Sequence, residues 1–184
     1  IGLDRPAPGD SETQWSRLAA RYLRKEFALT KEVKRATVHI AGMGLYELFI
    51  NGQRIGEQVL APAPTDYRKT ILYNTYDVTP QLQKENAIGV ILGNGRFYTM
   101  RQNYKPYKIP TFGYPKLRLN LIVEYTDGSR QTIASDISWK LTTEGPIRSN
   151  NEYDGEEYDA RKELGDWNRT GYDDTNWIPA GRVS

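Results

Sequence analysis

Carboxylate side chains concentrate in residues 150–159, where the sequence reads Asn-Asn-Glu-Tyr-Asp-Gly-Glu-Glu-Tyr-Asp. In an extended chain, Glu152, Asp154 and Glu156 would share one face of a strand at intervals of roughly 7 Å. That spacing lies within the range of about 6.5–9.5 Å for the carboxyl pair of inverting glycoside hydrolases. Gly155 interrupts the strand, however, and such catalysis needs carboxyl groups on opposed walls of a cleft. We therefore favour a loop that binds calcium or hydrogen-bonds a sugar or a neighbouring domain, because closely spaced oxygen ligands suit calcium.

A second group of candidate binding residues lies in the long segment 93–115, in which three prolines prevent regular structure. Aromatic faces stack on the apolar faces of sugar rings, and tyrosine adds a hydroxyl group. The alternative is that these rings cover the end of the core or a contact with another domain. We predict that an apolar surface, exposed when this domain is isolated, comprises Phe97, Tyr104, Tyr107 and Phe112.

Composition excludes several other kinds of site. His39 is the single histidine and there is no cysteine, so a zinc site or a thiol nucleophile is set aside. The formal charge of +2, from 25 basic and 23 acidic residues spread along the chain, gives no footprint for nucleic acid or an anionic membrane. No apolar run approaches the roughly 20 residues that span a bilayer. We therefore expect neither a nucleic-acid partner nor a membrane partner.

Short strands must position these side chains, because no segment shows a sustained helical period. Asn51-Gly52 and Asp127-Gly128 lie between apolar stretches and are the residue pairs that tight hairpins favour. Residues 87–92 read as a core strand, and a single helical turn is expected at Pro80 with Thr79 as its cap. Many short strands with turn signals predict an all-β fold, an antiparallel β-sandwich of jelly-roll or galactose-binding-domain-like type.

A length of 184 residues suits one domain with its own core. We expect a lead-in segment over residues 1–20, a β-sandwich over 21–165, and a tail over 166–184 that leads toward a further, downstream domain. The chain begins without methionine, which suggests a piece of a longer protein.

Several short motifs follow one another in a specific order. They are Arg24-Lys25-x-Phe27, Tyr46-x-Leu48-x-Ile50-Asn51-Gly52, Thr65-Asp66-Tyr67, Tyr76-Asp77-Val78-Thr79, Leu92-Gly93-Asn94-Gly95, Gly155-Glu156-x-Tyr158-Asp159-Ala160-Arg161 and Asp166-Trp167-x-x-x-Gly171-Tyr172-Asp173-Asp174. In this order the chain resembles the amino-terminal β-sandwich domain of bacterial α-L-rhamnosidases, which are inverting glycoside hydrolases.

The resemblance implies that the parent protein hydrolyses terminal α-L-rhamnose in a helical barrel far downstream. This chain would then be a non-catalytic accessory domain that packs beside its own catalytic domain and requires no cofactor. The resemblance favours a periplasmic or secreted protein, although the sequence is also compatible with the cytoplasm. The alternative implied is a module that binds rhamnose or another carbohydrate, with calcium as an optional cofactor. Carbohydrate would then bind at Asp66, Asn94, Tyr98 and Glu156, and calcium at Asp66 and Asp154.

Overall fold

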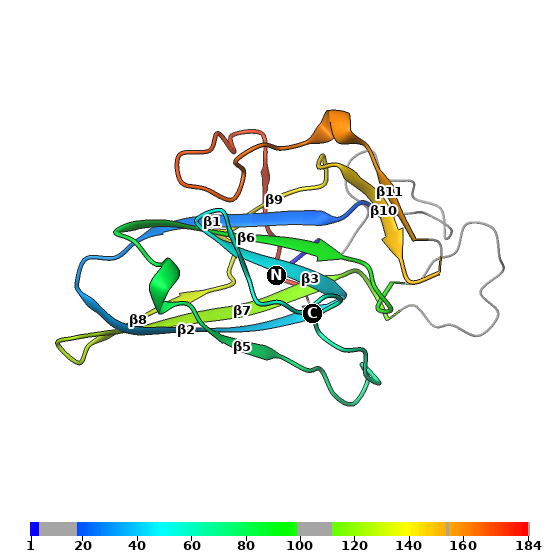
Figure 1. Cartoon of the computed structure of the whole chain (residues 1–184). Helices are drawn as coiled ribbons and strands as arrows, with labels where there is room; N and C mark the ends of the chain where they lie inside the picture. The colour runs from blue at the N-terminus through cyan, green and yellow to red at the C-terminus, as the bar shows by residue number, and fades with distance from the viewer. Residues whose placement is uncertain (4–17, 99–111, 154, 184) are drawn as a thin grey trace.

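The computed structural model describes residues 1–3, 18–98, 112–153 and 155–183. Two antiparallel sheets pack face to face in this part of the chain, and a separate two-stranded hairpin lies at one end (Figure 1). The six-stranded sheet has the order β12-β9-β1-β6-β3-β4, and the four-stranded sheet has the order β5-β2-β7-β8. The predicted antiparallel β-sandwich is therefore confirmed.

The elements have the following bounds. They are β1 (Arg21–Ala28), β2 (Val33–Met43), β3 (Leu45–Ile50), β4 (Gln53–Ile55), β5 (Asn74–Asp77), the 3₁₀ turn η1 (Thr79–Gln81), β6 (Glu85–Gly93), β7 (Lys116–Tyr125), β8 (Arg130–Ala134), β9 (Lys140–Thr142), β10 (Ile147–Asn151), β11 (Gly155–Tyr158), the 3₁₀ turn η2 (Ala160–Lys162) and β12 (Ile178–Pro179).

The main core lies between the two sheets and follows from a period of two along each strand. On β7, for example, Leu117, Leu119 and Leu121 are buried, while Arg118 between them is exposed. Strand β6 is different, because Ala87 to Val90 are buried without alternation. A central strand that is covered on both faces reads as a continuous apolar run, so something other than the four-stranded sheet must cover the outer face of β6.

Both hairpin predictions are confirmed. Asn51 and Gly52 have φ angles of 52° and 82°, the left-handed values that a two-residue turn requires, and the turn pairs Ile50 with Gln53. Strands β7 and β8 meet through the Asp127-Gly128 turn. The predicted helical turn also forms, as η1, but its cap differs. Val78 is the N-cap, and Asp77 Oδ1 accepts the hydrogen bond from Thr79 N at 3.0 Å.

The segment that follows β11 folds back over the outer face of the six-stranded sheet, above β1 and β6 in Figure 1. Its final strand β12 joins that sheet beside β9, with Ile178 opposite Leu141. Trp167 and Trp177 are buried in a second apolar cluster on this outer face, together with Tyr22 of β1. Residues 166–183, expected as a tail, therefore cover the sheet. That the chain leads on to a further domain stays a prediction.

We predict that Gly89→Ala of β6 loosens this cover. A Cβ at position 89 would lie 2.7 Å from Asn168 Cβ and 2.8 Å from Trp167 Cζ3, so the covering segment must move. Overpacking of this kind typically costs about 1–3 kcal/mol, which a urea unfolding curve would measure. Gly181→Ala is the matched control, because its Cβ would make only an ordinary contact of 3.4 Å with Gly2 O. Equal stability of the two variants would contradict the packing described here.

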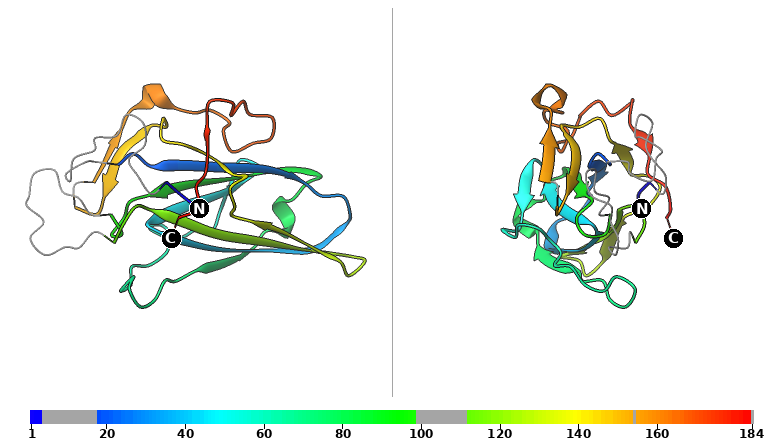
Figure 2. Two further views of the ribbon diagram at one scale, coloured as in Figure 1. Left: turned by 180° about the vertical axis from the view of Figure 1, so that it is seen from behind. Right: turned by 90° about the vertical axis from the view of Figure 1, so that its right-hand side faces the viewer.

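The two ends of the described chain lie side by side, as Figure 2 shows. Gly2 N donates to Gly181 O at 3.1 Å, and Gly181 N donates back to Gly2 O at 2.9 Å. The Ile1 ammonium donates to Leu117 O at 2.7 Å. Within the described residues, no helix is long and apolar enough to cross a membrane.

Candidate functional site

Asp66, one of the predicted carbohydrate and calcium ligands, lies in the loop between β4 and β5. Its Oδ1 accepts from Arg68 Nε at 3.2 Å and from Arg68 N at 3.3 Å. Lys69 Nζ lies 3.5 Å from Asp66 Oδ2. Side-chain and backbone hydrogen bonds from Arg68 lower the pKa of Asp66. The carboxylate is therefore ionised at neutral pH, and cations of its own loop already surround it.

Asn94, the second predicted ligand, is only 2% exposed and fastens the end of β6 to β10. Its Nδ2 donates to Leu18 O and Asn150 O, both at 2.8 Å, and its backbone N donates to Asn150 Oδ1 at 2.6 Å. Its Oδ1 is buried and has no hydrogen-bond partner among the residues that the structure describes. A buried acceptor without a partner costs free energy, so this oxygen is the one atom of Asn94 left to receive a ligand or a water molecule.

Tyr98, the predicted stacking residue, is buried, and its ring stacks on Tyr114 with 5.7 Å between centroids. Phe97 is buried as well, against Tyr67 at 5.2 Å and Phe112 at 5.9 Å. The prediction that Phe97 belongs to an exposed apolar surface is therefore wrong. The rings of this group pack against one another in stacked, tilted and edge-on arrangements and so fill the end of the sandwich. Tyr104 and Tyr107 lie outside the described residues.

The described part of the acidic run forms the end of β10, a turn at residues 152–153 and β11, and therefore not one strand. Glu156 is exposed on β11 opposite Asn150, whereas Glu152 lies in the turn, where Arg96 Nη1 donates to its Oε1 at 2.5 Å. That hydrogen bond raises the pKa of Arg96. The spacing expected of an extended run therefore does not arise between Glu152 and Glu156.

Calcium binding at Asp66 and Asp154 stays a prediction, because Asp154 lies outside the described residues. In the part of the chain that the structure describes, no three His, Asp or Glu residues gather closely enough to hold a metal ion.

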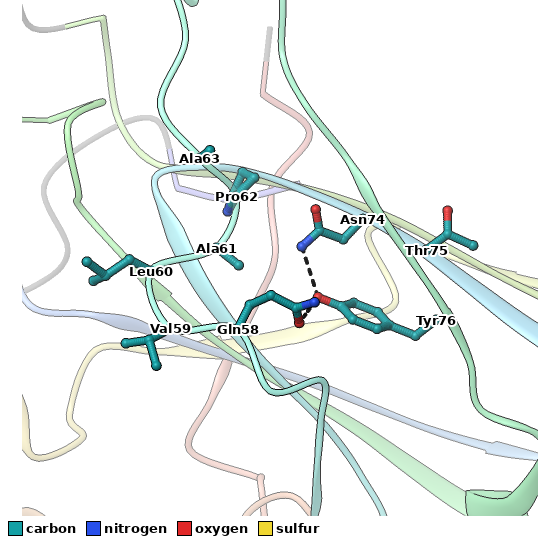
Figure 3. Close-up of a pocket in the computed structure, with 9 residues that line it drawn as sticks. All are labelled: Gln58, Val59, Leu60, Ala61, Pro62, Ala63, Asn74, Thr75 and Tyr76. Atoms are coloured by element: carbon teal, nitrogen blue, oxygen red, sulfur yellow. Dashed lines mark hydrogen bonds between the residues drawn. The ribbon is translucent and has the colours of Figure 1, made fainter.

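An open pocket of about 460 Å³ lies between residues 58–63 and strand β5 (Figure 3). The Tyr76 hydroxyl is the centre of its polar wall. It donates to Gln58 Oε1 at 3.1 Å, accepts from Asn74 Nδ2 at 2.9 Å, and lies 3.2 Å from the Tyr46 hydroxyl. Burial, and then the bond to Tyr76, raise the pKa of Tyr46. These amides and phenols exchange hydrogen bonds, but the pocket wall holds no carboxyl pair that could carry hydrolysis.

Arg24, which sequence reasoning quoted only as part of a motif, joins β1 to the covering segment. Its side chain is 2% exposed. Its Nε donates to Trp167 O and its Nη2 to Arg169 O, both at 2.9 Å. The guanidinium also forms ion pairs with Glu26 and Asp174. The motifs Arg24-Lys25-x-Phe27 and Asp166-Trp167 therefore belong to one contact, a pairing across about 145 residues that no local pattern could reveal.

Asp174 is held by a second cation, since Lys140 Nζ donates to its Oδ1 at 2.6 Å. Burial alone would raise the pKa of Asp174, but the hydrogen bond from Lys140 and the charge of Arg24 outweigh it and lower the pKa. These groups border a further open hollow of about 540 Å³. Because its charges are paired with one another, we assign this hollow a structural role.

Comparison with known proteins identifies the family. The model of the "Alpha-L-rhamnosidase N-terminal domain" matches residues 31–184. An α-L-rhamnosidase of Formosa agariphila is 47% identical over 164 residues, which are 86% of this chain and 17% of that protein.

Solved structures agree with this match. The α-L-rhamnosidase from Dictyoglumus thermophilum superposes with a TM-score of 0.83 at 47% identity, over 92% of this chain and 18% of that one. The α-L-rhamnosidase of Streptomyces avermitilis, solved in complex with L-rhamnose, gives 0.84 at 37% identity, over 92% of this chain and 16% of that one. The chain thus spans about one sixth of the length of the relatives it matches, and it belongs to the α-L-rhamnosidase N-terminal domain family.

Proposed function

We propose that this chain is a non-catalytic accessory domain of an α-L-rhamnosidase, and that it packs beside and supports the catalytic domain of the longer polypeptide. The observation that carries the proposal is the share of length, since the chain matches only about 17% of the Formosa rhamnosidase. The rest of such an enzyme has ample room for the catalytic residues. The carboxylates described above support the same reading, because Asp66, Glu152 and Asp174 are each paired with a cation.

We expect the isolated chain to hydrolyse an aryl α-L-rhamnoside no faster than buffer does, because its described part does not place two carboxyl groups on opposed walls of a cleft. Release of the aryl group, followed by absorbance, measures this, and the Dictyoglumus rhamnosidase serves as the positive control. Turnover that disappeared in Glu156→Gln would overturn the proposal and assign catalysis to the acidic run.

The alternative function, carbohydrate binding, is favoured by one observation, the buried Oδ1 of Asn94, which accepts no hydrogen bond from any described residue. An accessory domain that only packs against its neighbour should give no heat when millimolar L-rhamnose is added, with or without calcium, in a calorimetric titration. Saturable heat that needs calcium and is lost in Asp66→Asn would support the binding module instead. Arg68→Gln is the matched control, since it removes one of the two cations beside Asp66 and leaves the carboxylate.

A further inference from the structure

Exposed apolar side chains gather in one loop of the molecule. Within the described residues, eight large hydrophobic side chains are exposed, and five of them lie between β4 and β5. We call these five the loop patch: Val59, Leu60, Ile71, Leu72 and Tyr73. Leu60 is 70% exposed and Tyr73 66% exposed. Single exposed hydrophobic residues are ordinary, but a group of them usually marks an interaction surface.

The backbone holds the loop patch in its exposed position. Tyr46 N donates to Ala61 O at 2.7 Å, which fixes the chain directly after Leu60. Leu60 itself has a φ of 61°, a left-handed value that costs a bulky residue conformational energy. Val59 and Leu60 are among the residues that line the pocket, and Figure 3 shows their side chains directed away from Asn74 and Tyr76.

The loop patch continues onto a free sheet edge. Strand β5 follows Tyr73 directly and is the edge of the four-stranded sheet, where β2 is its one partner strand among the described residues. The Tyr73 ring lies 6.1 Å from the His39 ring of β2. An edge strand with apolar neighbours tends to pair with another chain unless something covers it.

The other described surfaces are less suited to an apolar partner. The covering segment with Trp167 and Trp177 already occupies the outer face of the six-stranded sheet. The outer face of the four-stranded sheet carries polar residues such as Arg118 and Thr132. Phe97, Tyr67 and Phe112 pack on one another at the aromatic end.

We propose that the loop patch and the β5 edge form the surface on which the neighbouring domain of the same rhamnosidase polypeptide docks. This inference rests on the proposed function and names the part of the domain that would carry it out. The partner is then an apolar face of a domain that is covalently connected to this chain.

The position of the chain ends supports that occupant. The Ile1 ammonium donates to Leu117 O near the start of β7. Lys116, the residue before Leu117, pairs with Met43 at the end of β2. Ala61 is bonded to Tyr46, three residues after Met43. The chain ends and the loop patch therefore lie at the same end of the sandwich. In a polypeptide six times longer, the flanking chain would leave this domain beside the loop patch. Such a covalent connection raises the effective concentration of the neighbouring domain, so a modest apolar area is enough for docking.

Amide hydrogen exchange tests the proposal with two proteins. One is the chain alone, and the other is a chimera in which the chain replaces the matching 18% of the Dictyoglumus rhamnosidase. We expect exchange across residues 57–76 to slow at least about tenfold in the chimera, because docking removes the local opening that exchange requires. Unchanged exchange there, with new protection elsewhere in the domain, would overturn the proposal.

Substitutions provide the second measurement. Leu60→Ser with Tyr73→Ser should leave the melting temperature of the chain alone within about 2 °C, since both side chains are exposed, and should lower that of the chimera by several degrees. Ile137→Ser is the matched control, an exposed apolar residue outside the patch, and should change neither protein. A melting temperature that fell equally in both proteins would place the residues in the core of the domain and overturn the proposal.

Three further outcomes are distinguished. If a Dictyoglumus enzyme without its matching domain kept its full melting temperature and activity, the proposed function itself would fail. If that deletion were damaging while the loop-patch substitutions were silent in the chimera, the docking surface alone would be wrong.

Sedimentation of the chain alone as a dimer, and its dissociation by Leu60→Ser, would mean that a second copy of the chain occupies the loop patch and would overturn the proposal. Should the chimera not fold, the same exchange comparison applies to the native Dictyoglumus enzyme and its excised domain.

Discussion

Arg24→Met is expected to lower the free energy of unfolding by roughly 3 kcal/mol, because removal of one partner from a buried ion pair leaves the others uncompensated. The substitution keeps the length of the side chain and removes its donors to Trp167 O and Arg169 O. It also leaves Asp174 with Lys140 as its only cation among the described residues. Urea unfolding followed by circular dichroism measures the change.

Arg130→Met is the matched control for this prediction. Arg130 is exposed and pairs with Glu124 at 2.8 Å, and such surface pairs are worth under about 1 kcal/mol. Tryptophan fluorescence is a second measurement of whether the covering segment has moved. Arg24 donates to the backbone oxygen of Trp167, and the Trp167 ring stacks on the Trp177 ring. If Arg24→Met and Arg130→Met were equally stable, the side chain of Arg24 would not hold the covering segment.

The pH dependence of stability should change in the same variant. Because the pKa of Asp174 is lowered in the folded protein, its contribution is complete above its unfolded pKa of about 3.9 and is lost as the pH falls through the lower folded value. Stability of the wild-type chain should therefore fall in acid partly through Asp174. Loss of Arg24 removes one of the charges that lower this pKa, so the fall attributable to Asp174 should be smaller in Arg24→Met. Unfolding curves at pH 6 and at about pH 3 compare the two proteins.

Trp139→Ala should be the most damaging single substitution in the main core, with an expected loss of about 3–5 kcal/mol. Its side chain is 0% exposed, and no other fully buried side chain described here is larger. The indole Nε1 donates to Ala134 O at 2.9 Å and so links the approach to β9 with the end of β8.

Trp139→Phe separates the two contributions of this residue. Phenylalanine keeps much of the apolar volume, although it is smaller than tryptophan, and it removes the donor to Ala134 O, so we expect a clearly smaller loss, of which roughly 1 kcal/mol reflects the hydrogen bond. Thermal unfolding by calorimetry would rank the two variants. A loss in Trp139→Phe as large as in Trp139→Ala would mean that the hydrogen bond, and not packing, dominates.

The sequence predicts the local features of the fold well, because they depend on nearby residues. Asn51-Gly52 specifies its turn through the left-handed φ values that these two residues adopt easily. The alternation along β7 specifies which of its faces is buried. The resemblance also identifies the family correctly, because it depends on the order of motifs and not on their contacts.

Contacts across long sequence separations could not be predicted in the same way. No local period indicates that Arg24 binds the segment after β11, or that Trp167 covers Gly89. The same limit explains the error at Phe97, since the aromatic count of a segment does not show whether its rings face solvent or one another. For Asn94, the resemblance implied a carbohydrate ligand, but the donor bonds to Leu18 and Asn150 required the three-dimensional structure.

The mutual hydrogen bonds between Gly2 and Gly181 join two segments that are far apart in sequence. In general, a unit whose entering and leaving segments run side by side can be inserted into a loop of another polypeptide, or lost from it, while the flanking parts of that polypeptide keep their spacing. The orientation of such a unit is set by the contacts along its sides more than by the connecting chain. A surface that fits those contacts is then what a new neighbouring domain has to supply.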